Sequence, residues 1–222
     1  MDTHKTDFPK EWLEEVTSYF LGLGFFRQFS VFESKLISHL ERVANADYLF
    51  CAGPLNPADE SKLSRKAEQI LLTLDKDRVW FTDCEADFQD GDYWYLRALL
   101  DWSHISQNRF KPQHLSEIWL PRRIPDPSRP DIDEQPIRVS FTLNGNEISI
   151  DLEEHGGWFD SRLIEAVNEA IHDTGFQFAA VQCISDQCAF VCYLALSEIH
   201  KLRAERGWKF HEEFFHDSFR QI

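Results

Sequence analysis

Residues 137–152 read IRVSFTLNGNEISIDL, and this stretch decides the fold of the C-terminal half of the chain. Two runs of alternating apolar and polar residues flank Asn144-Gly145, which is the strongest short-range signal for a two-residue hairpin turn. Pairing outward from the turn predicts one apolar face, made of Phe141 with Ile148, Val139 with Ile150, and Ile137 with Leu152. The other face is polar and pairs Thr142 with Glu147, Ser140 with Ser149, and Arg138 with Asp151. Turn chemistry, alternation and charge pairing therefore predict the same register.

The next segment predicts a helix that covers this hairpin. Gly156-Gly157 makes a turn, Asp160 can cap the helix, and Gly175 lies just past its end. The apolar face of the helix consists of Leu163, Ile164, Val167, Ala170 and Ile171.

Residues 176–184 and 187–194 predict a second hairpin around Ser185-Asp186. Both runs are rich in aromatic and small apolar side chains, which is typical of strands buried on both faces. A last helix is predicted at residues 196–206. The order ββαββα predicts an α+β module with a four-stranded, largely antiparallel sheet.

The first 120 residues carry mostly helical patterns. Pro9 suits a first helical turn, and an amphipathic helix is predicted to run to about Leu21, before Gly22 and Gly24. Residues 79–81 fit either a short strand or a buried connection, and the sequence leaves both open. Further helices are predicted at residues 30–44, 61–74, 90–106 and, from the heptapeptide HLSEIWL, 114–120.

Residues 121–136 read PRRIPDPSRPDIDEQP and separate the two patterns. Five prolines and a lack of apolar periodicity argue against regular secondary structure. The predicted organisation is therefore a mostly helical region at 1–120, a proline-rich linker at 121–136 and an α+β module at 137–222.

Composition and charge limit the partners of the chain. With 43% hydrophobic residues among 222, the chain can build a large core. A formal net charge of −15 would repel nucleic acids and anionic membranes, so the expected partner is a basic protein. No apolar run approaches the roughly 20 residues that span a bilayer. Residues 1–12 lack the apolar core of a secretory signal, which predicts a cytoplasmic protein.

No metal or cofactor is expected. The odd number of five cysteines indicates reduced thiols. Cys183 and Cys188 would face each other across a two-residue turn, which leaves a redox bridge open, but they lack the spacing of a zinc site and core packing is the simpler interpretation. HEEFFH at residues 211–216 spaces its His residues five apart, whereas a zinc-protease helix needs four.

The acidic segment DCEADFQDGD at residues 83–92 is the main candidate site. An EF-hand loop beginning at Asp83 would need Gly at Phe88 and Glu at Trp94, so calcium binding is not predicted. A solvated loop is the plainest interpretation, yet aromatic residues beside charged ones are typical of protein interfaces. The candidate partner-binding residues are Asp83, Glu85, Asp87, Phe88, Asp90, Asp92, Tyr93 and Trp94.

No enzyme motif stands out in the sequence. It has no G-x-S-x-G elbow, no P-loop and no G-x-G-x-x-G nucleotide signature, and no catalytic residue is assigned. Adjacent acids such as Glu153 and Glu154 could act in acid–base chemistry only within a cleft. A hydrolase or metal-dependent enzyme with a cleft between the two halves stays open as an alternative, as does a structural subunit of a larger assembly.

The positions Asn144-Gly145, Trp158, Asp160, Asn168 and Gly175, with RVWFTD at 78–83 and LLDWSHIS at 99–106 as looser matches, form a wider pattern. With this pattern, the last third of the chain resembles small bacterial proteins of polymorphic-toxin and contact-inhibition loci, which are often immunity proteins. The resemblance implies a cytosolic antidote that binds and neutralises a basic toxin domain without catalysis of its own. It carries over no active-site residue.

Overall fold

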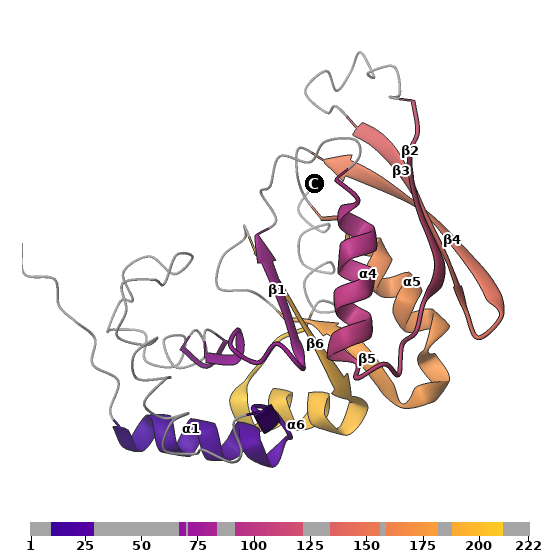
Figure 1. Cartoon of the computed structure of the whole chain (residues 1–222). Helices are drawn as coiled ribbons and strands as arrows, with labels where there is room; N and C mark the ends of the chain where they lie inside the picture. Colours follow the sequence, from indigo (N-terminus) through magenta and orange to yellow (C-terminus); the bar gives the residue numbers. More distant parts are fainter. Residues whose placement is uncertain are drawn as a thin grey trace, which may run out of the picture.

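The computed structural model describes residues 10–28, 67–69, 71–83, 92–121, 134–155, 159–181 and 188–210. They form an α+β fold with two antiparallel three-stranded sheets (Figure 1). Sheet A has the order β1-β6-β5, with bounds Val79–Asp83, Cys188–Ala195 and Phe176–Ala180. Sheet B has the order β2-β3-β4, with bounds Gln113–Trp119, Glu134–Leu143 and Asn146–His155. The helices are α1 Lys10–Gly22, α4 Trp94–Ile105, α5 Arg162–Ala170, the 3₁₀ helix η2 His172–Thr174, and α6 Leu196–Arg206.

The β3–β4 hairpin has the predicted register. Phe141 pairs with Ile148, and the pairing continues outward in step to Ile137 and Leu152. Asn144 and Gly145 have φ of 52° and 83°, which are the left-handed angles that a type I′ turn requires. On the polar face, Arg138 Nε donates to Asp151 Oδ1 over 2.7 Å. Local turn chemistry and alternation were therefore sufficient to define this element.

The prediction of a single four-stranded sheet is wrong. The β3–β4 hairpin pairs with β2, and the β5–β6 hairpin pairs with β1. Each hairpin has thus recruited a strand from the first 120 residues instead of joining the other hairpin. Pairing between strands far apart in sequence depends on which edges the helices leave open, and a local pattern does not specify it.

The prediction of a helix at residues 114–120 is also wrong, because Gln113–Trp119 is the strand β2. Every second side chain of β2 faces the core, namely Leu115, Glu117 and Trp119, whereas Ile118 is 52% exposed on the outer face. Seven residues are too few for the sequence to separate a period of 2 from one of 3.6. A left-handed His114 and a register shift between Gln113 and Ser116 mark the start of the pairing with β3.

Strand β6 lies at the centre of sheet A and is buried on both faces. Phe190, Cys192 and Leu194 belong to one core, whereas Val191 and Tyr193 belong to the other. The predicted burial of this hairpin on both faces is therefore confirmed for its described residues. Residues 79–81 are part of β1, so the strand is the correct one of the two interpretations for that segment.

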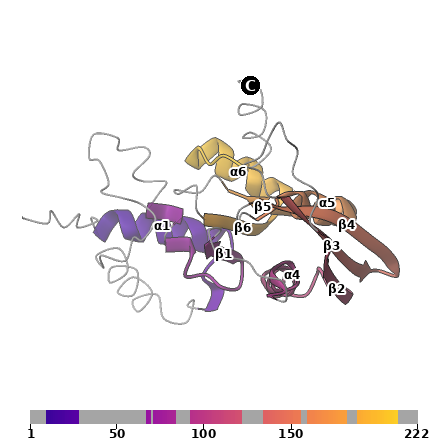
Figure 2. The same ribbon diagram turned by 90° about the horizontal axis from the view of Figure 1, so that it is seen from above.

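The helices pack in two layers around sheet A. One face of the sheet packs against α1 and α6, and the other packs against α4 and α5. Figure 2 shows sheet A between α6 and α4. Helices α4 and α5 contact both sheets, so the second core fills the space between sheet A and sheet B. No helix of the described residues is long and apolar enough to cross a membrane.

The predicted helix at 196–206 has the bounds of α6, and the predicted first helix matches α1 within a few residues. The predicted linker at 121–136 overlaps β3, because residues 134–136 are already paired with β4. Pro136 is tolerated there because it lies near the start of the strand and its carbonyl accepts Leu120 N over 2.9 Å. The division into regions 1–120 and 137–222 stays a prediction, although both regions contribute strands to both sheets. The predicted helix at 30–44 and half of the one at 61–74 lie outside the described residues, and of the latter helix residues 67–69, 71 and 72 are helical.

Candidate partner-binding surface

The acidic segment connects the end of β1 to the start of α4. Asp83 is the last residue of β1 and pairs with Cys188, although only its backbone is described. Asp92, Tyr93 and Trp94 lead into α4. The other predicted residues of this site, Glu85, Asp87, Phe88 and Asp90, lie outside the described residues.

Tyr93 is the predicted site residue that the structure exposes most clearly. Its side chain is 52% exposed, and its backbone has φ 51°, in the left-handed region. Leu100 is 55% exposed, and Arg97 lies between these two residues on the helix. Residues at i, i+4 and i+7 share one side of a helix, so Tyr93, Arg97 and Leu100 form one outward surface, here named the α4 face.

Trp94 does not belong to the α4 face. Its side chain is half-buried, with ring centroids 5.4 Å from Phe159 and 6.3 Å from Tyr95. The sequence pattern does not distinguish Tyr93 from Trp94, because both are aromatic residues beside the acidic ones. Successive positions at a helix start point in directions roughly 100° apart, so one ring faces the solvent and the next lies against the core.

An aromatic cluster packs against the start of α4. Phe159, which directly precedes Asp160, is its centre, and its ring lies 5.4 Å from Trp80, 5.1 Å from Tyr95 and 6.0 Å from Trp102. The Trp80 ring also meets Trp102 edge-on at 5.6 Å. Such pairs favour fixed mutual orientations, so the backbone beneath the α4 face is held by packing.

Glu117 of β2 fixes the first turn of α4 to sheet B. Its Oε2 accepts Leu96 N over 3.1 Å, and its Oε1 accepts Trp119 Nε1 over 3.1 Å. The first amides of a helix lack partners within the helix, so this carboxylate serves as a cap from another strand. Sequence reasoning missed Glu117, because the predicted helix at 114–120 gave no reason to place it beside α4.

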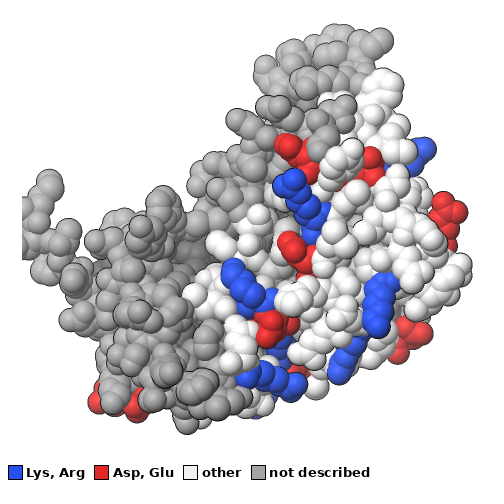
Figure 3. Space-filling view, in the orientation of Figure 1, with Lys and Arg blue, Asp and Glu red and all other residues white. Residues whose placement is uncertain are grey.

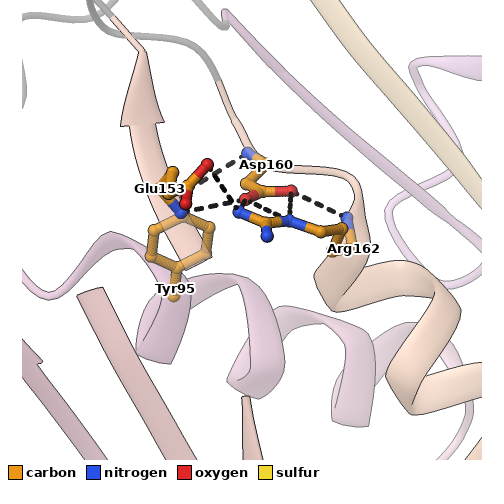
Figure 4. Close-up of polar contacts among 4 residues, drawn as sticks. All are labelled: Tyr95, Glu153, Asp160 and Arg162. Carbon is orange, nitrogen blue, oxygen red and sulfur yellow. Dashed lines mark hydrogen bonds and ion pairs between the residues drawn. The ribbon is translucent and has the colours of Figure 1, made fainter. Parts of the chain in front are cut away.

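A second polar network, around Asp160, joins α4, β4 and α5 (Figure 4). Asp160 N donates to the Tyr95 hydroxyl over 3.2 Å, and Asp160 Oδ2 accepts Glu153 N over 2.9 Å. Asp160 Oδ1 accepts Arg162 N over 3.0 Å just before α5, although the N-cap position is Ser161, one residue after the predicted cap. Arg162 forms ion pairs with Asp160 and, over 3.4 Å, with Glu153.

The charged groups of this network bind one another and join β4 to α5. Burial alone would raise the pKa of Asp160, but hydrogen bonds from Arg162 and the Glu153 amide bring it below its ordinary value. An ionised Asp160 bound to Arg162 is a poor acid or base. Glu153, which the sequence raised as a possible acid–base residue, is half-buried and engaged with Arg162. Within the described residues, no group of three or more His, Cys, Asp or Glu could hold a metal ion.

The buried carboxylates predict an unusual dependence of stability on pH. Burial raises the pKa of Glu117, and burial likewise raises the pKa of Asp75 and Glu68. Each then binds its proton more tightly in the folded chain than in the unfolded chain, so its stabilising effect is lost as pH rises through the folded pKa. Asp160 behaves in the opposite way, losing its effect as pH falls through its lowered pKa. We expect the free energy of unfolding to be largest at mildly acidic pH and to fall toward pH 7.

Urea unfolding between pH 4 and pH 8 checks this expectation. Glu117→Gln should flatten the fall toward neutral pH, because the amide oxygen can still accept Leu96 N but does not titrate. Asp160→Asn should destabilise most near pH 7 and least at low pH. Identical pH profiles for the wild type and Glu117→Gln would contradict the role of this carboxylate.

Of the three C-terminal cysteines, only Cys192 has a described side chain. Cys192 is buried and free, and burial raises the pKa of its thiol, so it is a core residue and not a reactive thiolate. Cys183 lies outside the described residues, and of Cys188 only the backbone is described. Residues 211–216 also lie outside the described part of the chain.

The positions that carried the sequence resemblance have structural roles where the structure describes them. Asn168 uses its amide group to pair with both backbone groups of Phe178 in the edge strand β5, at 2.7 and 2.8 Å. Gly175 ends η2 with φ 73°. Trp158 lies outside the described residues.

Comparison of the chain with protein-family models, curated proteins and solved structures finds no match.

Proposed function

We propose that the chain is an acidic protein-binding protein of the immunity type, which binds and neutralises a basic toxin domain in the cytoplasm. The binding surface consists of the α4 face and the acidic segment before it. The observation that carries the proposal is the exposed Tyr93 ring, 52% accessible, on a rigidly supported helix start directly after an acidic segment.

The charge of the chain supports a basic partner. Residues 1–120 contain 20 acids and 13 bases, and residues 137–222 contain 14 acids and 7 bases, so the acidic excess is spread along the chain. A distributed negative field attracts a basic protein over distances of about 10 Å at moderate salt and increases the rate of encounter. Short-range packing is then needed to hold the complex together.

The α4 face supplies that packing. Tyrosine is enriched among residues that dominate binding energy, because its ring is large, has few rotatable bonds and carries a hydroxyl. Leu100 adds a second exposed apolar side chain on the same side of α4. The aromatic cluster around Phe159 and the Glu117 cap hold this helix start in place, so little order has to be gained on binding.

The first experiment identifies the partner and measures its association. The tagged chain is used to capture proteins from the native host, and the captured protein is identified, expressed and tested by surface plasmon resonance at two salt concentrations. We expect a basic partner whose association slows as salt is raised. Reversal of Asp87, Asp90 and Asp92 to Lys should slow association and flatten its salt dependence. An acidic partner, or association that ignores both salt and the reversed charges, would refute the proposal.

Two matched variants test the α4 face itself. Tyr93→Ala should speed dissociation by tenfold or more, about 1.4 kcal/mol or above, because a central aromatic anchor is removed. Ile118→Ala is the control, since Ile118 is also 52% exposed but lies on the outer face of sheet B. Tyr93→Ala keeps a Cβ at the left-handed position, so the backbone preference changes little. Equal effects of the two variants would place the interface elsewhere.

A further inference from the structure

The described residues form a pocket of about 240 Å³ near the C-terminal end of α4, at the opposite end of this helix from Tyr93. The end of α4, the strands β5 and β6 and the first turn of α6 meet there. Its lining residues are Arg27, Arg78, Ile105, Ser106, Gln107, Arg109, Phe176, Tyr193, Ala195, Ser197 and Glu198.

The charge of this pocket contrasts with that of the whole chain. Three arginines line it, and Glu198 is the one carboxylate among its described lining residues, whereas the chain carries a net charge of −15. In Figure 3, several Lys and Arg side chains lie over the lower part of the described surface, interspersed with Asp and Glu. A local excess of positive charge in an acidic protein indicates a site for an anion.

Arg78 and Glu198 compensate each other. Arg78 donates to both carboxylate oxygens of Glu198, at 3.2 and 2.8 Å, and also to the carbonyls of Tyr193 and Leu23. These contacts occupy both terminal nitrogens of Arg78, so this arginine forms the wall of the pocket. Arg109 is exposed, and its contacts with the Phe176 ring and the Tyr193 side chain leave further N–H groups of its guanidinium for a ligand.

Arg109 lies against the ring of Phe176. Its guanidinium carbon lies 4.4 Å from the centroid of the Phe176 ring, and that ring stacks on Tyr193 with centroids 5.3 Å apart and planes 9° apart. This contact holds the guanidinium beside the pocket, where it presents several N–H donors. The fork of a guanidinium matches the oxygens of a phosphate or carboxylate and binds them through two hydrogen bonds.

Hydroxyl groups and a helix start complete the pocket. The Tyr193 side chain is hydrogen-bonded to Thr174 and Arg109, so it holds Arg109 at the pocket. Ser197 lies in the first turn of α6, an 11-residue helix, where the helix dipole favours negative charge.

We propose that this pocket binds a small molecule that carries a phosphate monoester. A phosphate dianion can use the Arg109 guanidinium and the Ser197 hydroxyl together, whereas a carboxylate monoanion can use only part of them. The volume of about 240 Å³ admits a small molecule and not a folded partner. The site does not depend on the proposed protein-binding function, because it lies at the other end of α4.

Isothermal titration calorimetry of the full chain in low-salt chloride buffer tests the site with three probes: inorganic phosphate, a nucleoside 5′-monophosphate and acetate. We expect saturable binding of both phosphate probes with a dissociation constant below about 10 mM, and acetate at least tenfold weaker. Stronger binding of the monophosphate than of inorganic phosphate would identify an ester as the ligand, and equal binding would identify free phosphate as sufficient. Absence of saturable phosphate binding, or acetate binding as tight as phosphate, would overturn the proposal.

Matched variants locate the binding. Arg109→Gln should weaken phosphate binding at least tenfold, because it removes the charged fork. Ser197→Asp should weaken it as strongly while keeping or raising the melting temperature, since Asp is favourable in the first turn of a helix. Arg138→Gln removes an arginine from the outer face of sheet B and should leave binding unchanged. Equal losses in Arg138→Gln and Arg109→Gln, or wild-type binding by Arg109→Gln, would refute the assignment.

Discussion

Replacing Phe141 with Asp is expected to unfold the protein. Phe141 is 1% exposed and meets Phe110 edge-on at 5.8 Å, and the Phe110 ring in turn meets Phe178 of β5 at 5.4 Å. These three rings connect sheet B, the loop after α4 and sheet A. Removing a buried Phe ring costs about 3–5 kcal/mol, and a buried unpaired carboxylate adds to this. The sum is comparable to the whole stability of a typical domain, about 5–15 kcal/mol.

The neighbouring residue provides the control. Thr142 lies on the polar face opposite Glu147, so Thr142→Lys should change the free energy of unfolding by less than about 0.5 kcal/mol. Urea melts followed by circular dichroism give both values. Ile150→Asp should be milder than Phe141→Asp, because Ile150 is only half-buried. Equal losses at Phe141 and Thr142 would show that the two faces are assigned incorrectly.

Replacing Arg78 with Met should destabilise the protein by about 3–5 kcal/mol, the usual cost of removing one partner of a buried ion pair. The Arg78 and Glu198 side chains are 10% and 18% exposed. Without the guanidinium, Glu198 would keep its charge in a largely buried position and would retain only the Ala195 amide as a described partner, at 2.7 Å. The carbonyls of Leu23 and Tyr193 would also lose a donor, and the Phe25 ring would lose the cation 4.4 Å from its centroid.

Arg138→Met is the matched control for Arg78. Arg138 also binds a carboxylate through two hydrogen bonds, at 2.7 and 3.1 Å to Asp151, but that pair is exposed to solvent. We expect a much smaller loss there, because water screens the pair and solvates either partner left alone. Adding Glu198→Gln to Arg78→Met should recover part of the lost stability, which a double-mutant cycle measures. Similar losses for Arg78→Met and Arg138→Met would contradict the structural role of burial.

Local signals were sufficient for the elements that depend on neighbours in the sequence. The β3–β4 register followed from Asn144-Gly145 and from alternation, and both act over a few residues. The α4, α5 and α6 helices followed from an apolar stripe and from residues that start or stop a helix. In each case the same residues specify the element and its buried face.

The candidate surface was predicted only in part, for a geometric reason. Composition marked the segment from Asp83 to Trp94, but it could not tell which aromatic ring faces the solvent. That depends on the direction of the chain where it enters α4, which the Glu117 cap and the Phe159 cluster determine. Both come from segments that lie well after α4 in the sequence, so no local pattern near Tyr93 reveals them.

The sequence by itself determined the α+β class, the hairpin register, and the positions of α1, α4, α5 and α6, because each of these depends on interactions within a dozen or so residues. Tertiary structure decided that HLSEIWL is a strand, that β1 and β2 join separate sheets, and that the Arg109 pocket forms where α4, β5, β6 and α6 meet. Strand partners and pockets are chosen by the burial of whole faces and by the edges that remain open. The packing of the whole core therefore determines the strand partners and the pocket, and a local sequence pattern does not specify them.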